Sequence, residues 1–258
     1  MSAGRRRFSS PKACAALALS AAMDLALAGC DLAHGRPAPG PEVPRPENEL
    51  HFAALYKDNC AGCHGDGGRN GAAISLANPV YVAIAKDRLA GIITKGVRGH
   101  LMPAFGKSAG GTLTDRQIAI LAQGIIDQWG DPNHYAGQVP PPYESKLTPD
   151  AGRGQQAYGV FCAKCHGENG EGGAADKESS MTPTGSGKPG SIVDPSFLAL
   201  ISDQNLRSVT IAGRPDQAMP DWRSDAAQPM TDQQITDIVA WIASKRVPNP
   251  GQPYPSHP

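Results

Sequence analysis

The sequence predicts an all-α protein in which two similar units follow one another. Apolar residues recur at helical spacing, as at Ile118, Leu121 and Ile125 near the end of the first unit. No stretch shows the sustained alternation of apolar and polar residues that indicates a half-buried strand. Much of the first half recurs in the second half, and a chain of 258 residues is long enough for two small domains.

The internal repeat is clearest around two cysteine clusters. The sequence CAGCHGDGG begins at Cys60, and CAKCHGENG begins at Cys162. Further on, the segment from Asn78 resembles the segment from Asp194. The main difference is a loop rich in glycine, serine and charge, roughly 174–190, which we expect at the surface of the second unit. Paired positions include Gly96 with Gly213, Met102 with Met219, and LTDRQI from 113 with MTDQQI from 230.

Helices are expected to run into each cysteine cluster and to close each unit. The helices before the clusters should cover 49–59 and 151–161. The closing helices have candidate N-caps at Thr114 or Asp115 and at Thr231 or Asp232. Shorter helices are expected over 80–86, 89–94, 197–201 and 206–211.

Proline-rich stretches divide the chain into segments. Prolines are dense in RPAPGPEVPRPENE and in GQVPPPYESKLTPD. Such stretches favour extended, semi-rigid connections. We therefore predict a signal segment at 1–29, a tether at 30–48, the first unit at 49–136, a linker at 137–150, the second unit at 151–247 and a tail at 248–258.

The first thirty residues are typical of an export signal. A basic start precedes a short, mostly apolar run over 13–28, which is too brief for a stable membrane anchor. The run ends in LAGC, which resembles the lipobox of bacterial lipoproteins, so we expect cleavage before Cys30 and lipid on Cys30. Asp31 resembles the residue that keeps such lipoproteins on the periplasmic side of the inner membrane. An ordinary signal peptide with an accidental cysteine is the alternative.

Charge and composition limit the function. The 24 basic residues balance the 24 acidic residues, which gives no electrostatic basis for nucleic-acid binding. Aromatic residues make up 5% of the chain, so each unit has few large side chains to fill its hydrophobic core. A large flat cofactor in each unit would fill that gap.

Each cysteine cluster has the form C-x-x-C-H, which three kinds of site use. Zinc ribbons space their C-x-x-C pairs by about 15 to 20 residues, whereas about a hundred residues separate these pairs. A thioredoxin-like redox pair is expected next to a βαβ unit, and the helical pattern of this sequence does not predict one. Haem attachment fits best, because two thiols on one turn can each add to a vinyl group while the histidine binds iron. The predicted attachment residues are Cys60, Cys63, Cys162 and Cys165, with His64 and His166 as iron ligands.

A second iron ligand should recur in both units. Met102 and Met219 occupy equivalent positions, and each is followed by proline. A thioether favours ferrous iron and raises the reduction potential. His100 is the rival ligand, but its counterpart is Gln217, so a pair of histidines could form in the first unit only. We therefore predict the two methionines as the sixth ligands.

Each unit resembles a class I cytochrome c in two motifs, its C-x-x-C-H cluster and its Met-Pro step. The resemblance covers roughly 50–130 and 152–246, and the whole chain resembles a tethered diheme cytochrome. It implies two tandem class I cytochrome c domains, each wrapped around one covalently bound haem c.

The resemblance also implies how the first and last helices of each unit cross. In this family a small residue on one helix meets an aromatic residue on the other. The repeat places large and small residues oppositely in the two units, so we expect Phe52 to face Gly124 and Gly154 to face Trp241.

Further residues are candidates for the surroundings of each haem. In this family a backbone carbonyl accepts a hydrogen bond from the second ring nitrogen of the proximal histidine, and Pro79 and Pro195 are the candidates. Candidates for contacts with haem propionates, or else for solvated surface positions, are Arg98, Arg214 and Trp222.

Iron closed by histidine and methionine has no open position for a substrate. We therefore expect an electron carrier rather than an enzyme, with no small-molecule substrate. Expected partners are redox proteins, such as a membrane oxidase, a reductase or a reaction centre, together with the membrane through the lipid anchor. The alternatives are a haem enzyme, such as a peroxidase or a sulfur-compound dehydrogenase, and a fixed electron-transfer subunit of a larger respiratory complex.

Overall fold

The computed structural model describes residues 40, 43, 45–97, 100–135, 137–173, 189–224 and 227–248. The predicted signal segment, Cys30, Arg98, most of the tether and of the 174–190 loop, and the tail beyond residue 248 lie outside these residues. Residues from Arg45 onward form one compact unit. Within it we call residues 49–136 repeat 1 and residues 151–247 repeat 2.

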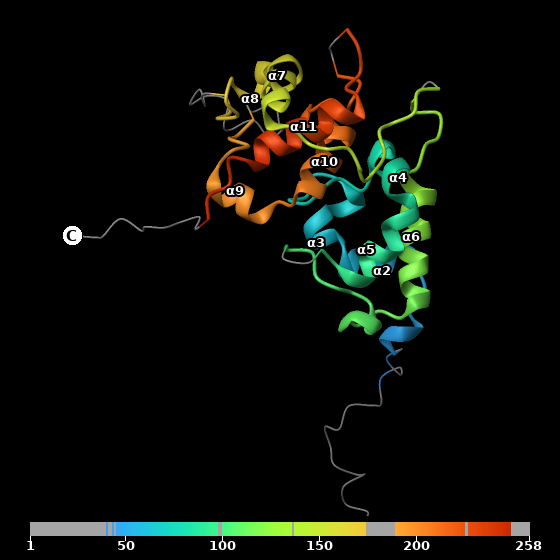
Figure 1. Cartoon of the computed structure of the whole chain (residues 1–258). Helices are drawn as coiled ribbons and strands as arrows, with labels where there is room; N and C mark the ends of the chain where they lie inside the picture. Colours follow the sequence, from blue (N-terminus) through green and yellow to red (C-terminus); the bar gives the residue numbers. More distant parts are fainter. Residues whose placement is uncertain are drawn as a thin grey trace, which may run out of the picture. The chain divides into compact units, whose positions relative to one another are not determined.

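Helices make up the regular structure of both repeats, which confirms the predicted all-α class (Figure 1). In the described ranges the extended segments pair only as isolated bridges, Gly106 with Leu113 and Arg214 with Met219. No helix in these ranges is long and apolar enough to cross a membrane. The elements are η1 (Pro46–Asn48), α2 (Phe52–Asn59), α3 (Ala61–His64), η2 (Asp66–Gly68), α4 (Pro79–Ala85), η3 (Lys86–Arg88), α5 (Leu89–Lys95), η4 (Lys107–Ala109), α6 (Asp115–Trp129), α7 (Ala151–Phe161), α8 (Ala163–His166), α9 (Pro195–Leu200), α10 (Asp203–Ala212), η6 (Pro215–Gln217) and α11 (Asp232–Ala243).

The closing helices of the two repeats begin in the same way. Thr114 is the N-cap of α6 and Thr231 is the N-cap of α11. Each threonine side chain accepts from a glutamine backbone amide three residues on, and that glutamine side chain accepts from the threonine amide. These capping boxes satisfy amides that the first turn leaves unpaired. The threonines, rather than the aspartates that follow them, are therefore the caps.

The first and last helices of each repeat cross at the predicted pairs. A Cβ atom built on Gly124 of α6 would lie 2.1 Å from the Phe52 ring of α2. A Cβ atom built on Gly154 of α7 would lie 2.9 Å from Cβ of Trp241 and 2.0 Å from the Asp237 carbonyl oxygen, both in α11. Both predicted contacts are confirmed, and each glycine allows a helix approach that a side chain would block.

The predicted linker 137–150 runs along repeat 2. Arg207 of α10 is 5% exposed, and its guanidinium donates to the carbonyls of Pro142 at 2.7 Å and Tyr143 at 3.1 Å. The same side chain forms an ion pair with Asp232. A buried guanidinium needs such partners, because an unpaired buried charge is costly. The linker is therefore fixed to repeat 2 by hydrogen bonds.

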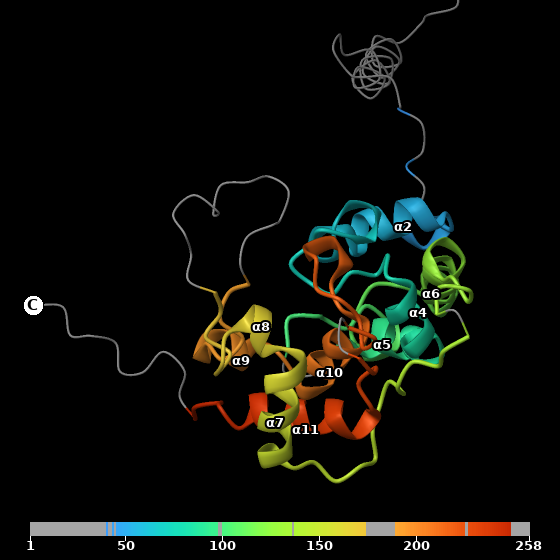
Figure 2. The same cartoon turned by 90° about the horizontal axis from the view of Figure 1, so that it is seen from above.

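The two repeats contact each other where α10 lies beside α4 (Figure 2). Asn78 is 1% exposed and caps α4 by accepting from the amides of Val80 and Tyr81. Its Nδ2 atom donates to the Ala212 carbonyl, at the end of α10, at 2.8 Å. One amide side chain therefore starts a helix of repeat 1 and binds a helix end of repeat 2.

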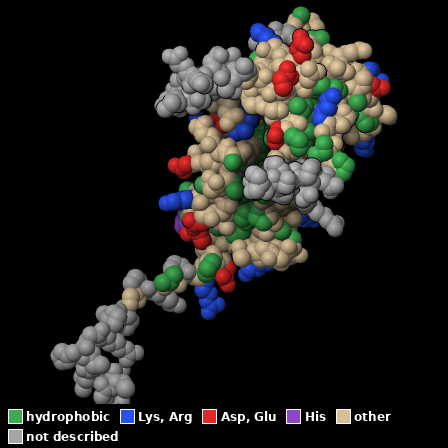
Figure 3. Space-filling view, turned by 90° about the vertical axis from the view of Figure 1, so that its left-hand side faces the viewer, with side chains coloured by type: hydrophobic (Ala, Val, Ile, Leu, Met, Phe, Trp, Pro, Cys, Tyr) green, Lys and Arg blue, Asp and Glu red, His purple; other side chains and the backbone are tan. Residues whose placement is uncertain are grey.

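The surface carries charges of both signs. On the face drawn in Figure 3, acidic and basic side chains are scattered, and hydrophobic side chains gather near the middle. This distribution agrees with the balance of 24 basic and 24 acidic residues.

Candidate functional site

The two C-x-x-C-H clusters form the same short helical turn. Cys60 precedes α3 and Cys162 precedes α8. In each turn the histidine amide donates to the carbonyl of the first cysteine at 3.0 Å. The turn keeps two cysteines and one histidine of each repeat together, as haem attachment requires.

All four of these cysteines are free thiols. Cys63 and Cys165 are exposed, whereas Cys60 and Cys162 are partly buried. Burial raises the pKa of the Cys60 thiol to about 11 and that of Cys162 to about 12. A redox-active C-x-x-C pair instead depends on a cysteine whose pKa is lowered. Burial therefore shifts these two thiols away from the low pKa on which disulfide exchange depends.

A tyrosine and a glycine hold the chain as it leaves each turn. The Tyr56 hydroxyl donates to the Gly65 carbonyl at 2.9 Å, and the Tyr158 hydroxyl donates to the Gly167 carbonyl at 2.8 Å. Both glycines have a positive φ, 83° and 82°. A Cβ atom on Gly65 would also fall 1.8 Å from the Arg69 carbonyl oxygen. The glycine after each histidine is therefore required by the backbone.

His64 is held by a carbonyl other than the predicted one. Its ring is buried, and Nδ1 lies 2.8 Å from the Ile74 carbonyl oxygen. The Pro79 carbonyl instead accepts from the Tyr135 hydroxyl at 2.6 Å. The prediction that Pro79 orients His64 is therefore wrong. With Nδ1 bonded to Ile74, Nε2 is the ring nitrogen left for a metal.

His166 has no such partner in the described part of the chain. Its Nδ1 atom is buried and makes no hydrogen bond there, so the prediction for the Pro195 carbonyl is also wrong. Pro79 and Pro195 each stand at the first position of a helix, behind the caps Asn78 and Asp194. Proline favours that position because its fixed φ suits a helix start. Helix initiation therefore explains why both prolines recur.

Burial lowers the pKa of both His64 and His166. For His64 the hydrogen bond with the Ile74 carbonyl opposes this effect without cancelling it. Burial therefore favours the neutral imidazole, which is the form that binds metal ions.

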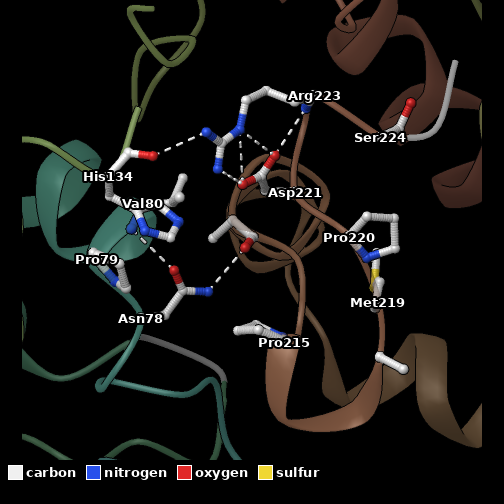
Figure 4. A pocket seen from close by; sticks show the side chains of 12 residues that line it. Asn78, Pro79, Val80, His134, Pro215, Met219, Pro220, Asp221, Arg223 and Ser224 are labelled. Atoms are coloured by element: carbon white, nitrogen blue, oxygen red, sulfur yellow. Dashed lines mark hydrogen bonds and ion pairs between the residues drawn. The ribbon is translucent and has the colours of Figure 1, made fainter. Parts of the chain in front are cut away.

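The two methionine segments are fixed by the same backbone bonds. The amide of Val97 donates to the Met102 carbonyl, and the amide of Arg214 donates to the Met219 carbonyl, each at 3.0 Å. The preceding glycine has a φ of 65° in repeat 1 and 66° in repeat 2. Met219 also lines a cavity of about 480 Å³ between the repeats, together with Asn78 and Pro215 (Figure 4).

The remaining predicted residues lie at contacts between the repeats. The His100 ring, the rival iron ligand, has Nδ1 3.0 Å from the Leu200 carbonyl oxygen of repeat 2. Trp222 is buried, with its ring centroid 6.2 Å from that of Tyr135. Arg214 reaches the Gly71 carbonyl of repeat 1 at 3.1 Å. The propionate candidates Arg214 and Trp222 therefore have protein partners, and Arg98 lies outside the described residues.

These donors fit a haem c in each repeat. Free thiols are available for the porphyrin vinyl groups, and a neutral histidine and a thioether for iron. Among the described residues, no cluster of three or more His, Cys, Asp or Glu side chains could hold a metal ion by itself. A bound porphyrin would supply the further nitrogen ligands that iron needs beside a histidine and a methionine.

Sequence reasoning missed three residues that shape the sites. Ile74 acts through a backbone carbonyl, so its side chain gives no signal. Tyr56 and Tyr158 could have been found, because each stands four residues before the first cysteine of its cluster.

Comparison with known families agrees with this arrangement. Residues 47–123 match the family of cytochrome c oxidase, cbb3-type, subunit III, and residues 151–245 match the cytochrome c family. Each repeat therefore contains a cytochrome c domain, and two such domains imply two covalently bound haem c groups.

Curated relatives include two proteins named cbb3-type cytochrome c oxidase subunit CcoP. The one from Azospirillum brasilense is 31% identical over 137 residues, which cover 47% of this chain and 40% of the relative. The one from Azospirillum sp. strain B510 is 30% identical over 151 residues, covering 52% and 46%. The chain thus spans less than half the length of these relatives. Among solved structures, a chain of the Kuenenia stuttgartiensis reducing HAO-like protein complex is 18% identical, with a TM-score of 0.45 over 80% of this chain and all of that chain.

Proposed function

Because two cytochrome c domains in tandem make this chain a diheme electron-transfer cytochrome, we propose that it carries electrons between redox proteins on the periplasmic side of a bacterial inner membrane. One haem c is attached through Cys60 and Cys63, and the other through Cys162 and Cys165. Lipid on Cys30 tethers the protein to the membrane, and LAGC at the end of the export signal supports this anchor.

In this proposal His64 and Met102 bind one iron, and His166 and Met219 bind the other. The observation that carries it is the duplicated framework. Both attachment turns share their tyrosine and backbone bonds, and both methionine carbonyls accept from the amide that follows a left-handed glycine. Haem c bound there supplies a centre that alternates between ferric and ferrous iron. Histidine and methionine together leave no position for a substrate, which favours a carrier over a catalyst.

The proposed partner is a membrane oxidase of the terminal respiratory type. The support is the name of the two Azospirillum relatives, which are oxidase subunits. A reductase or a reaction centre is the alternative partner. A fixed subunit would copurify with an oxidase in mild detergent, whereas a free carrier would be recovered alone.

The ligand assignment is tested by optical and magnetic spectroscopy of the oxidised protein. We expect near-infrared sulfur-to-iron charge transfer from both haems, and Met102→Ala and Met219→Ala should each remove about half of that band. Mass spectrometry should find two porphyrins on each chain. A high-spin ferric signal from one haem in the unsubstituted protein would instead favour the haem-enzyme alternative.

A further inference from the structure

Two side chains of repeat 2 grip the backbone of repeat 1 next to its attachment turn. The Asp216 carboxylate accepts from the Asn70 amide at 3.0 Å, and the Arg214 guanidinium donates to the Gly71 carbonyl at 3.1 Å. The two charged groups are themselves 3.9 Å apart, and the Asp216 side chain is 6% exposed. We call this pair, Arg214 with Asp216, the clamp.

On the repeat 1 side, the clamp binds directly behind the first attachment turn. A Cβ atom on Gly71 would lie 2.3 Å from the Cys63 carbonyl oxygen and 2.5 Å from the His64 carbonyl carbon. Asn70 has a φ of 61°, an uncommon conformation for a residue other than glycine. The gripped segment is therefore packed against the residues that carry the first redox centre.

On the repeat 2 side, the clamp is bonded to the methionine segment. The Arg214 amide donates to the Met219 carbonyl, and the Met219 amide donates to the Arg214 carbonyl, each at 3.0 Å. Arg214 thus bonds to the Met219 segment through its backbone and to the Gly71 segment through its side chain. Two hydrogen-bonded steps connect a proposed iron ligand of repeat 2 with the attachment segment of repeat 1.

The clamp is specific to repeat 2. In the alignment that pairs Met102 with Met219, the counterparts of Arg214 and Asp216 are Val97 and Gly99, which offer neither a guanidinium nor a carboxylate. The Val97 amide nevertheless makes the same backbone bond to Met102. The methionine segment therefore makes this backbone bond without a charged pair in repeat 1, and in repeat 2 the charged pair also contacts repeat 1.

We propose that the clamp is the bridge that couples the two redox centres, and that it sets the rate at which they exchange electrons. This inference rests on the proposed function. Each exchange moves one electron from the ferrous centre of one repeat to the ferric centre of the other, so it balances without a proton or another reactant. Electronic coupling decays less steeply along bonds and hydrogen bonds than across a gap, so a bonded bridge accelerates the exchange.

The test copies repeat 1 into repeat 2. The double variant Arg214→Val with Asp216→Gly keeps residue types that repeat 1 already tolerates at these positions. After partial reduction by pulse radiolysis of the full holoprotein, we expect exchange between the centres to slow at least tenfold. Both sulfur-to-iron bands should remain. Hydrogen–deuterium exchange at the Asn70 amide should become faster, which reports loss of the clamp independently of electron transfer.

Arg223→Gln is the matched control, because it removes another bond between the repeats. The Arg223 guanidinium donates to the His134 carbonyl at 3.0 Å, and neither residue belongs to an attachment turn. It should leave the exchange rate within twofold. If the double variant also exposes the amides of α4 that Asn78 caps, the milder Asp216→Asn is used, and a threefold or greater slowing is expected.

An unchanged rate in a variant whose Asn70 amide is released would overturn the proposal, as would equal slowing by Arg223→Gln. Failure of the proposed function is distinguishable from either result. In that case the unsubstituted protein would already lack two reducible low-spin centres.

Discussion

In both repeats the helix crossing pairs one aromatic side chain with a glycine. The helix that supplies the aromatic side chain differs between the two repeats. In repeat 1 the aromatic residue, Phe52, lies on the first helix and Gly124 lies on the last. In repeat 2 the glycine, Gly154, lies on the first helix and Trp241 lies on the last. Volume-conserving exchanges of this kind are the best tolerated core changes. The crossing therefore constrains the pair, and either helix can supply the larger side chain.

The polar groups at the crossings differ more strongly. Asp237 of α11 is 2% exposed and accepts from the Arg153 side chain, the Gln233 side chain and the Asp150 amide. Its counterpart in α6 is Ile120, which packs against the apolar core. Repeat 2 therefore fixes its crossing with a buried carboxylate where repeat 1 uses apolar contact.

Replacing the glycine at each helix crossing with alanine should destabilise the two repeats by different amounts. Gly154→Ala should lower the free energy of unfolding of repeat 2 by about 3 kcal/mol or more, since the new Cβ meets the α11 backbone. Gly124→Ala should cost about 1 kcal/mol, because the Phe52 ring can turn away and alanine favours the helix. Guanidinium unfolding of each variant measures both values. Adding Phe52→Leu to the Gly124→Ala variant should restore its free energy of unfolding. Equal destabilisation by Gly154→Ala and Gly124→Ala would contradict the contacts described.

Exchanging the residue types of the two helix caps should destabilise the protein strongly at Asn78 and very little at Asp194. Asn78→Asp removes the donor to the Ala212 carbonyl in a buried site and should cost about 2 to 3 kcal/mol. Asp194→Asn is the matched control, because the exposed Asp194 only accepts hydrogen bonds and asparagine can still do so. Its effect should stay within about 0.5 kcal/mol. Urea unfolding measures the free energy of unfolding of both variants. A large loss of stability in Asp194→Asn would mean that the exchange weakens the helix cap itself, so the loss in Asn78→Asp could not be assigned to the contact between the repeats.

Acid should weaken repeat 2 through Asp237. Burial raises the pKa of this carboxyl, but the bonds from Arg153, Gln233 and the Asp150 amide outweigh burial and leave the pKa below its usual value. The stabilisation is therefore complete above the unfolded pKa of about 3.9 and is lost as pH falls through the lower folded pKa. Asp237→Asn should cost about 1 to 2 kcal/mol at pH 7 and flatten this acid dependence.

Unfolding measured from pH 7 to pH 2 on the wild type and on Asp237→Asn isolates this carboxyl. Parallel curves for the two proteins would rule out the assigned role. Ile120→Val in repeat 1 is the control, and its small cost should not depend on pH.

The smallest predicted effect is a loss of stability that should be equal in the two repeats. Tyr56→Phe and Tyr158→Phe each remove one hydroxyl bond to a glycine carbonyl and should each cost about 1 kcal/mol. Burial raises the pKa of Tyr56 to about 12, so its hydroxyl remains a donor at neutral pH. Thermal unfolding of both variants should give matching shifts. A difference above about 1 kcal/mol would mean that the two attachment turns are not equivalent.

The sequence predicted those parts of the fold that side chains specify locally. The attachment clusters and the candidate threonine caps followed from residue type and spacing, and the crossing pairs followed from the resemblance to class I cytochromes c together with the internal repeat. The partner of His64 did not, because every residue offers the same carbonyl and the recurrence of Pro79 and Pro195 reflects helix initiation.

Contacts between the repeats could not be predicted from periodicity, which reports only the face that a helix buries. The signal lay instead in departures from the repeat. Arg214 stands where repeat 1 has Val97, and Asn78 stands where repeat 2 has Asp194. Both departures proved to be contacts across the two halves.

The clamp also gives the molecule a polarity. It joins unlike surfaces, the Met219 segment of repeat 2 and the segment behind the attachment turn of repeat 1. The corresponding surfaces that face solvent also differ, since Leu101 beside Met102 is 77% exposed and Lys164 in the attachment turn of repeat 2 is exposed. Contacts between unlike surfaces are not related by a two-fold axis. A donor and an acceptor would therefore meet chemically different ends, one that carries the exposed Leu101 and one that carries the exposed Lys164.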